Sequence, residues 1–181
     1  SIALINEPVR SATLEAIDIA ADKGALISFD PNLRPPLWPD LDVAHEWICR
    51  GMELCDVVKV SEQEMTFITG LEDPLQGMQA LWEVGPELVA VTRGGDGCFY
   101  YNGEIDGESP GFTVPVDETT GCGDAFVAAM LVKLLESEND VSDMSAEELE
   151  ALFRFANAAG ALTATGKGAI PSLPTREEVH E

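Results

Sequence analysis

The most constraining feature of this sequence is an alternation between short apolar runs and segments whose apolar residues recur at helical spacing. The apolar runs are often β-branched and predict buried strands at Ile2–Ile5, Leu26–Phe29, Val57–Val60 and Leu88–Val91. The segments between them predict helices at Thr13–Ala21, Val43–Leu54, Glu62–Ile68 and Leu75–Val84. Strands that alternate with helices form parallel sheets covered by helices, so the sequence predicts an α/β fold.

The rest of the chain predicts a hairpin and three helices: Cys98–Tyr101 with Phe112–Val116, then about 123–135, about 146–164, and a short helix after Thr175. Thr175 and Glu178 have the spacing of a capping box. The sequence opens with Ser1 directly on a predicted strand, and a parallel strand needs neighbours. We therefore expect this chain to be part of a longer domain.

Charge narrows the range of functions. The 181 residues include 33 Asp and Glu against 10 Lys and Arg, a net charge of −23 at pH 7. Nucleic acids and anionic membranes bind clustered Lys and Arg, so we expect neither partner. No apolar run approaches the roughly 18 residues of a spanning helix, and no signal peptide opens the sequence. Four cysteines without C-x-x-C spacing are typical of free thiols and favour a cytoplasmic location.

The acidity has two interpretations. One is a well-solvated surface, and the other is adaptation to high salt, which the presence of only four lysines suggests. A melting temperature that stays flat from low to molar KCl would remove the second interpretation.

The segment Glu118-Thr-Thr-Gly-Cys-Gly-Asp124 runs directly into a predicted helix. Gly121 and Gly123 allow backbone N–H groups to converge at the helix N-terminus, whose dipole favours an anion such as phosphate. Asp124 stands beside them and could accept a proton from an attacking hydroxyl. The alternative is that Asp124 only caps the helix, because Asp is a favoured N-cap residue.

Two further loops follow predicted strands, at the sheet edge where α/β proteins bind ligands. After one strand, the hydroxyl of Thr92 and the close backbone approach allowed by Gly94 and Gly97 suit phosphate groups, although an ordinary turn explains them equally well. After another strand, Arg34 is a permanently charged anion binder, and Asn32 belongs to good turn chemistry. The alternative for Arg34 is an ion pair with one of the many carboxylates.

Ser61 and Glu64 have capping-box spacing at the start of a predicted helix, and capping alone explains them. Two common nucleotide motifs are missing from the sequence, the GxxxxGK[ST] phosphate loop and a G-x-G-x-x-G after the first strand. His45 and His180 have no partners in the sequence, and we interpret both as structural or surface residues.

Taken together and in this order, the four segments resemble the PfkB, or ribokinase-like, sugar kinases. The loops at Phe29–Trp38 and Val58–Glu64 resemble those of fructokinases in particular, and the likeness extends to Arg154–Ala159 and Gly166–Ser172. The resemblance implies a ribokinase-like fold, a three-layer αβα arrangement around a mainly parallel sheet. It also implies ATP-dependent phosphorylation of a sugar hydroxyl, with Mg²⁺ on the ATP and fructose as the leading substrate.

The resemblance assigns a role to each matching residue. Asp124 matches the catalytic base, and Gly121, Cys122 and Gly123 match the anion hole over the transferred phosphate. Arg34 falls where related kinases contact substrate phosphate or acid groups as well as nucleotide. The residues that match contacts to ATP and its Mg²⁺ are Asn32, Arg34, Ser61, Glu64, Thr92, Gly94, Gly97 and, beside the adenine, Asn157.

Two positions depart from the family pattern. Glu118 replaces an Asp that belongs to a monovalent-cation site, for which the resemblance implies Glu118, Thr120 and Ser172 here; whether K⁺ binds is left open. Cys122 replaces an Ala. A thiol at a helix N-terminus can have a lowered pKa, which would make Cys122 reactive, whereas the alternative is a small apolar filler.

The N-terminal strands and β-lid of this family grip the sugar and often form a dimer interface, and this sequence contains no counterpart of them. We therefore expect residues 1–181 to be the C-terminal part, ATP-binding and catalytic, of a single PfkB-type kinase domain that forms a homodimer through its lid when complete. The alternatives are a kinase for 2-keto-3-deoxygluconate or another sugar, and a truncated nucleotide-binding remnant without turnover.

Overall fold

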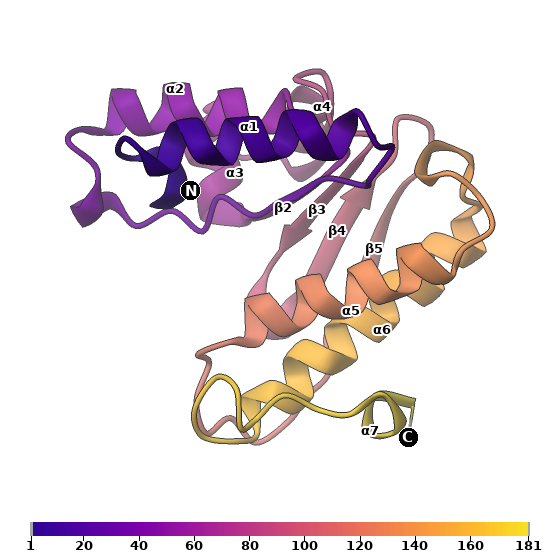
Figure 1. Ribbon diagram of the computed structural model, residues 1–181. Helices are drawn as coiled ribbons and strands as arrows, with labels where there is room; N and C mark the ends of the chain where they lie inside the picture. The colour runs from indigo at the N-terminus through magenta and orange to yellow at the C-terminus, as the bar shows by residue number, and fades with distance from the viewer. Residues whose placement is uncertain (1, 181) are drawn as a thin grey trace. The chain divides into compact units, whose positions relative to one another are not determined.

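In the computed structural model, which describes residues 2–180, two of the predicted strands form a parallel pair within the sheet (Figure 1). β2 (Val57–Ser61) pairs with β3 (Leu88–Thr92) from Val57 opposite Leu88 to Ser61 opposite Thr92, and the first four residues of each strand are buried. A shorter strand, β1 (Ser28–Phe29), pairs in parallel with the start of β2. Apolar, β-branched sequences suit strands that are covered on both faces.

The helical elements up to β3 are η1 (Ile2–Leu4), α1 (Val9–Ala21), η2 (Pro35–Leu37), α2 (Leu41–Met52), α3 (Glu62–Thr69) and α4 (Pro74–Trp82), where η marks a 3-10 turn. Local sequence sets several of their ends. The side chains of Asp40 and Asp73 accept hydrogen bonds from first-turn N–H groups of α2 and α4. Gly70, in the left-handed conformation, ends α3.

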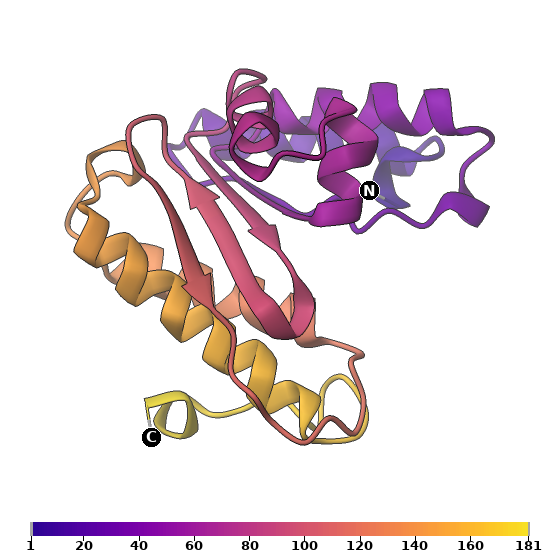
Figure 2. The ribbon, with the colours of Figure 1, turned by 180° about the vertical axis from the view of Figure 1, so that it is seen from behind.

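After β3 come η3 (Gly94–Asp96), β4 (Gly97–Tyr101), β5 (Asp106–Pro110), α5 (Cys122–Glu136), η4 (Val141–Asp143), α6 (Ala146–Ala164) and α7 (Arg176–His180). β4 and β5 run in opposite directions, as Figure 2 shows. The sheet has five strands in the order β1-β2-β3-β4-β5 and is mixed but mainly parallel. The α/β class predicted from the sequence is therefore confirmed.

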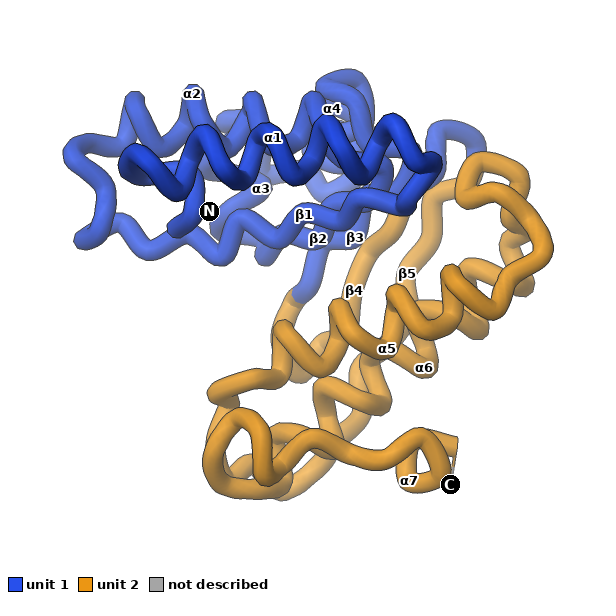
Figure 3. Tube along the Cα trace, in the orientation of Figure 1, with its two compact units in different colours: residues 1–92, 101–104 blue, residues 93–100, 105–181 orange. Residues whose placement is uncertain are grey.

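The chain divides into two compact units, residues 1–92 with 101–104 and residues 93–100 with 105–181 (Figure 3). In unit 1, fully buried side chains of α2, α3 and α4, among them Ile48, Met65 and Leu81, build the core with β2 and β3. In unit 2, the Phe153 ring of α6 stacks on Tyr100 with centroids 4.6 Å apart and lies 6.2 Å from the Phe126 ring of α5. Helix α6 thus packs against both the hairpin and α5.

The predicted helices are all present, and the bounds predicted for α6 agree with those observed. Helix α1 begins four residues before its predicted start, at Val9 instead of Thr13. Helix α7 follows the Thr175 capping box, in which the Glu178 carboxylate accepts hydrogen bonds from the Thr175 N–H and hydroxyl. Within residues 2–180, no helix is both long and apolar enough to span a membrane.

Three strand predictions differ from the structure: two are wrong and one is confirmed only in part. Ile2–Leu4, within the first predicted strand, forms a 3-10 turn, and Leu4 and Ile5 are buried against Trp38 and Ala44 without joining the sheet. A short apolar run requires burial but does not by itself specify a strand. Only Ser28 and Phe29 of the second run pair with β2, and neither is fully buried.

The third difference concerns the second strand of the predicted hairpin. Its second strand is the polar segment Asp106–Pro110 and not Phe112–Val116, and only Ser109 within it is buried. Four residues connect Tyr101 to Asp106, so the short connection places the strand where propensity alone would not. Pairing with a neighbour overrides the weak intrinsic preference of this segment for a strand.

We predict that Gly97→Ala destabilises the chain strongly whereas Gly95→Ala does not. Gly97 has φ of +95°, and a Cβ there would lie 2.1 Å from the backbone oxygen of Ser109. Gly95 has nothing within 4 Å of a built Cβ. The expected loss of unfolding free energy is about 3 kcal/mol or more for Gly97→Ala and well under about 1 kcal/mol for Gly95→Ala, measured by urea denaturation. Equal losses in both variants would contradict the argument.

Candidate functional site

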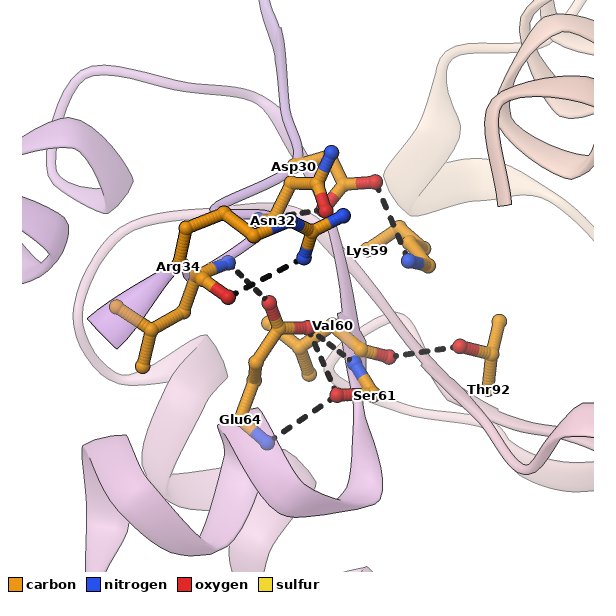
Figure 4. Close-up of polar contacts among 9 residues, drawn as sticks. Asp30, Asn32, Arg34, Lys59, Val60, Ser61, Glu64 and Thr92 are labelled. Carbon is orange, nitrogen blue, oxygen red and sulfur yellow. Dashed lines mark hydrogen bonds and ion pairs between the residues drawn. The ribbon is translucent and has the colours of Figure 1, made fainter. Parts of the chain in front are cut away.

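The loop after β1 is held by the carboxylate of Asp30 (Figure 4). One carboxylate oxygen accepts a hydrogen bond from the Asn32 N–H at 2.9 Å, and the other lies 3.2 Å from the Lys59 ammonium of β2. Asn32 has φ of +42°, a left-handed backbone that Asn tolerates better than most residues. The turn predicted for this segment is confirmed, and it depends on a strand that the sequence pattern did not connect to it.

A second carboxylate, that of Glu64 at the start of α3, reaches the same loop (Figure 4). Its Oε1 accepts a hydrogen bond from the Leu33 N–H at 2.7 Å. Its Oε2 accepts from the N–H and the hydroxyl of Ser61, each at 2.8 Å, and the Ser61 oxygen accepts from the Glu64 N–H. The capping box predicted for Ser61 and Glu64 is confirmed, and Glu64 also fixes the loop that carries Asn32 and Arg34.

Arg34 and Thr92 present polar groups at the same unit. The exposed Arg34 guanidinium donates to the Leu33 carbonyl at 3.2 Å. Within the described residues it has no carboxylate partner, so the alternative of an ion pair is wrong. The Thr92 hydroxyl at the end of β3 donates to the Val60 carbonyl of β2 at 3.3 Å.

In unit 2, no side chain of the described residues caps the N-terminus of α5. Gly121 is the N-cap residue, with φ of +89°, and a Cβ there would lie 3.1 Å from Ala169. Asp124 is the third residue of the helix, is exposed, and forms no hydrogen bond or ion pair within residues 2–180. The alternative that Asp124 caps the helix is therefore wrong. The N–H groups of Gly123 and Asp124 also have no acceptor in the described chain, as expected for a first turn without a capping side chain.

Glu118 connects the segment before α5 to the loop after α6. Its carboxylate accepts a hydrogen bond from the Gly168 N–H at 2.9 Å, and hydrogen bonds from the Thr120 side chain and the Gly168 N–H hold the pKa of Glu118 below its ordinary value. The Ser172 hydroxyl donates to the Gly168 carbonyl at 2.5 Å and to the Ala169 carbonyl at 3.1 Å. These contacts connect Glu118, Thr120 and Ser172 through one loop. Carboxylate, hydroxyl and carbonyl oxygens are donors that fit a hard cation, so the chemistry of this set suits K⁺.

The remaining predicted residues of unit 2 differ in exposure. Gly94 is exposed, in the left-handed conformation, and Gly97 is buried. Asn157 of α6 is buried, and its amide donates to the carbonyl and hydroxyl oxygens of Ser109 at 3.0 and 3.1 Å. The Asn157 side chain therefore ties α6 to β5.

The chain resembles known proteins throughout its length. The model of the family described as "pfkB family carbohydrate kinase" matches residues 1–176. The chain belongs to this family. Its PfkB relatives include fructokinase-1 of Oryza sativa subsp. japonica, which is 46% identical over 99% of this chain and 55% of its own length. The chain thus spans about half the length of the curated relatives it matches.

Solved structures of fructokinases also resemble the chain. Fructokinase from Vibrio cholerae O395 bound to fructose, ADP and a calcium ion is 36% identical, with a TM-score of 0.90 over 99% of this chain and 57% of the other. Fructokinase from Xylella fastidiosa with bound ATP is 33% identical, with a TM-score of 0.90 over 99% of this chain and 58% of the other. The predicted ribokinase-like fold and the resemblance to fructokinases are therefore confirmed.

The interpretation of Cys122 as a reactive thiol with a lowered pKa is wrong. Burial raises the pKa of the Cys122 thiol above its ordinary value, so Cys122 is not an activated thiolate. Its Sγ lies 4.0 Å from the Glu118 carbonyl. The effect of burial on the pKa exceeds the opposing effect of a backbone hydrogen bond, which favours the interpretation of Cys122 as a small apolar filler.

Two residues of this region, Asp30 and Lys59, are not among those predicted from the sequence. The signal for Lys59 was a lysine within the apolar run of β2, where an unpaired charge would be costly. The signal for Asp30 was its position directly after the preceding strand. Each residue explains the other, since the two side chains form an ion pair.

We predict that all four thiols of the folded chain react with iodoacetamide more slowly at pH 8 than an ordinary thiol. Burial raises the pKa of Cys55 and Cys98 from an ordinary 9.0 to about 12, so each holds about 10³-fold less thiolate. Burial also raises the pKa of Cys49 and Cys122. Mass-spectrometric time courses measure each rate. The chain unfolded in urea is the control, and labelling of folded Cys122 at the unfolded rate would overturn this prediction.

Proposed function

We propose that this chain carries the ATP-binding and catalytic portion of a sugar kinase, residues 1–181 of a single PfkB-type domain, with fructose as the sugar that is phosphorylated. The single observation that carries the proposal is the start of α5, where, among residues 2–180, neither the Asp124 carboxylate nor the backbone N–H groups of Gly123 and Asp124 have a hydrogen-bond partner. The fructokinase relatives, one of them with fructose and ADP bound, support the choice of sugar.

In this proposal Asp124 is the general base. Its carboxylate accepts the proton of the sugar hydroxyl as that oxygen attacks phosphorus. A carboxylate without an internal partner has both oxygens available for this contact. Phosphoryl transfer needs little covalent help from a protein, so placing the hydroxyl and removing its proton are the main tasks of this residue.

The turn at Gly121, Cys122 and Gly123 forms the anion hole. Backbone N–H groups and the positive end of the α5 dipole stabilise the charge that develops on the transferred phosphate. Gly121 is needed because its left-handed backbone and its close approach to Ala169 both exclude a side chain. Cys122 lies within this turn as a neutral thiol at neutral pH.

Bound ATP supplies the phosphoryl group, and its Mg²⁺ neutralises part of the phosphate charge. The exposed, cationic Arg34 and the Asn32 amide are suited to bind anionic groups. In this proposal Arg34 contacts the substrate phosphate in addition to the nucleotide. Glu64 orders the loop that carries both. The full set of nucleotide contacts proposed here is Asn32, Arg34, Ser61, Glu64, Thr92, Gly94, Gly97 and Asn157.

A monovalent cation, K⁺, is proposed at Glu118, Thr120 and Ser172, whose oxygens lie around the Gly168 loop. Hydrogen bonds from the Thr120 side chain and the Gly168 N–H lower the pKa of Glu118, which favours the charged carboxylate that a cation needs. Binding of the cation would replace the hydrogen bonds that now hold this loop.

Two alternatives stay open to test. Related loops in kinases for 2-keto-3-deoxygluconate make another sugar the second candidate substrate, and a nucleotide-binding remnant without turnover is the third. A homodimer formed through the lid of a complete domain, and a cytoplasmic location, are part of the same proposal. Calorimetric titration of this chain with MgATP tests nucleotide binding, because a chain without affinity gives no binding heat. A remnant that binds nucleotide without turnover would give binding heat but no ADP release.

We predict that Asp124→Asn lowers kcat for fructose phosphorylation about 10²-fold or more and leaves folding and the affinity for MgATP nearly unchanged. The assay measures ADP release with fructose, ribose and 2-keto-3-deoxygluconate, with and without K⁺. It uses this chain and, where its gene encodes more sequence, the longer product. Asp140→Asn, at another exposed carboxylate, is the matched control. An Asp124→Asn enzyme within a few-fold of wild type would remove Asp124 as the base.

We further predict that Ser61→Ala and Ser145→Ala have equal effects on stability but unequal effects on nucleotide binding. Both serines complete capping boxes, with Glu64 and with Glu148, at nearly the same distances. Each substitution should cost about 1 kcal/mol of unfolding free energy. Only Ser61→Ala should weaken MgATP binding, by about tenfold if its hydroxyl contacts a charged phosphate. Equal MgATP affinities in the two variants would leave Ser61 as a helix cap alone.

A further inference from the structure

Lys59 is an unusual lysine for this chain. Of the four lysines, all within the described residues, it alone is buried, with 8% of its surface exposed. It lies in β2, between the fully buried Val58 and Val60. A charged ammonium is placed there at a cost in free energy unless a partner compensates it. The proposed function assigns it no role.

The partner of Lys59 is Asp30, and the pair is shielded from solvent. The Lys59 Nζ lies 3.2 Å from Asp30 Oδ2, and the two side chains are 10% and 18% exposed. Asp30 Oδ1 accepts the hydrogen bond from the Asn32 N–H at 2.9 Å (Figure 4). The same carboxylate therefore neutralises the lysine with one oxygen and closes the turn at the left-handed Asn32 with the other.

The carboxylates of Asp30 and Glu64 accept hydrogen bonds from successive backbone N–H groups of this loop. Asp30 holds the Asn32 N–H, and Glu64 holds the next one along the chain, that of Leu33 at 2.7 Å. Glu64 receives hydrogen bonds at both oxygens, but only Asp30 has a cation beside it. Without that cation, Asp30 would be a shielded charge with one hydrogen-bond donor, and rotation toward water would release Asn32.

We propose that Lys59 is a positioning residue which, through Asp30, fixes the loop from Asp30 to Arg34. Lys59 holds the Asp30 carboxylate, the carboxylate holds the Asn32 turn, and the turn sets the direction in which Asn32 and Arg34 point. This inference deepens the proposed function and rests on it for the identity of the ligand, a phosphate-bearing nucleotide or substrate. The positioning itself is independent of that ligand.

The first test is amide hydrogen exchange of this chain without ligand. Lys59→Met should speed exchange at the Asn32 and Leu33 amides about tenfold or more, while the central amides of β2 and β3 keep their protection. Lys59→Arg, which keeps the cation, should restore slow exchange. Lys133→Met is the matched control, because Lys133 lies 3.3 Å from Glu136 in a surface pair of α5. Unchanged exchange at Asn32 and Leu33 in Lys59→Met would overturn the proposal.

A double variant tests whether Lys59 acts through Asp30. Asp30→Asn keeps an oxygen for the Asn32 N–H but removes the charge that Lys59 compensates. The pair Lys59→Met with Asp30→Asn should therefore exchange more slowly at Asn32 than Lys59→Met alone, because no unpaired charge is left in place. Exchange in the double variant as fast as in the single one, or faster, would show that Lys59 does not act through this carboxylate.

Ligand binding separates this inference from the proposed function. With MgATP as the probe, Lys59→Met should raise the Kd about tenfold, and in an active kinase it should raise KM while kcat stays within about threefold of wild type. Lys133→Met should change neither. If Lys59→Met changes amide exchange but the wild-type chain does not bind MgATP, the proposed function is removed and the positioning role of Lys59 stays intact. Changed exchange with unaltered MgATP affinity would overturn the link between the loop and the nucleotide.

Discussion

The parallel pairing of β2 with β3 is the constraint on which the candidate residues of unit 1 depend. Its register sets Ser61 opposite Thr92, so both strands end at the same edge of the sheet. The Thr92 hydroxyl bonds to the Val60 carbonyl and reinforces that register. A one-residue slip would turn every side chain of a strand to the other face, and Lys59 would lose Asp30. The buried apolar residues of the two strands thus fix where the polar residues stand.

Several acidic side chains of this strongly acidic chain hold loops in place through hydrogen bonds to the backbone. Asp56, Glu64 and Glu118 each accept a hydrogen bond from a backbone N–H that is 29 to 50 residues away, on Ile27, Leu33 and Gly168 respectively. A carboxylate offers two strong acceptor oxygens, which lets one side chain hold a loop that has no regular backbone pairing. Part of the acidity therefore serves to fasten loops, and neither a well-solvated surface nor adaptation to salt accounts for that part.

Periodicity and capping chemistry predict this fold where structure is local, and they fail where it depends on distant partners. The bounds of α6 and the capping boxes at Ser61 and Thr175 follow from neighbours within a few residues. By contrast, Asp106–Pro110 becomes a strand because of the hairpin that precedes it, and Leu4 and Ile5 are buried in a segment that is not a strand. The ion pair of Asp30 with Lys59 joins residues 29 apart, and no local pattern encodes it.

The helix N-termini differ in whether a side chain caps them. Helices α2, α3, α4 and α6 each begin with an Asp or Ser whose side chain accepts a hydrogen bond from the first turn. Helix α5 begins with Gly121, and its first-turn N–H groups at Gly123 and Asp124 have no acceptor within residues 2–180. A capping side chain is worth about 1 kcal/mol, so α5 lacks a stabilising contact that these four helices have. An anion bound at α5 would satisfy the same N–H groups, and a side-chain cap would compete with it for them.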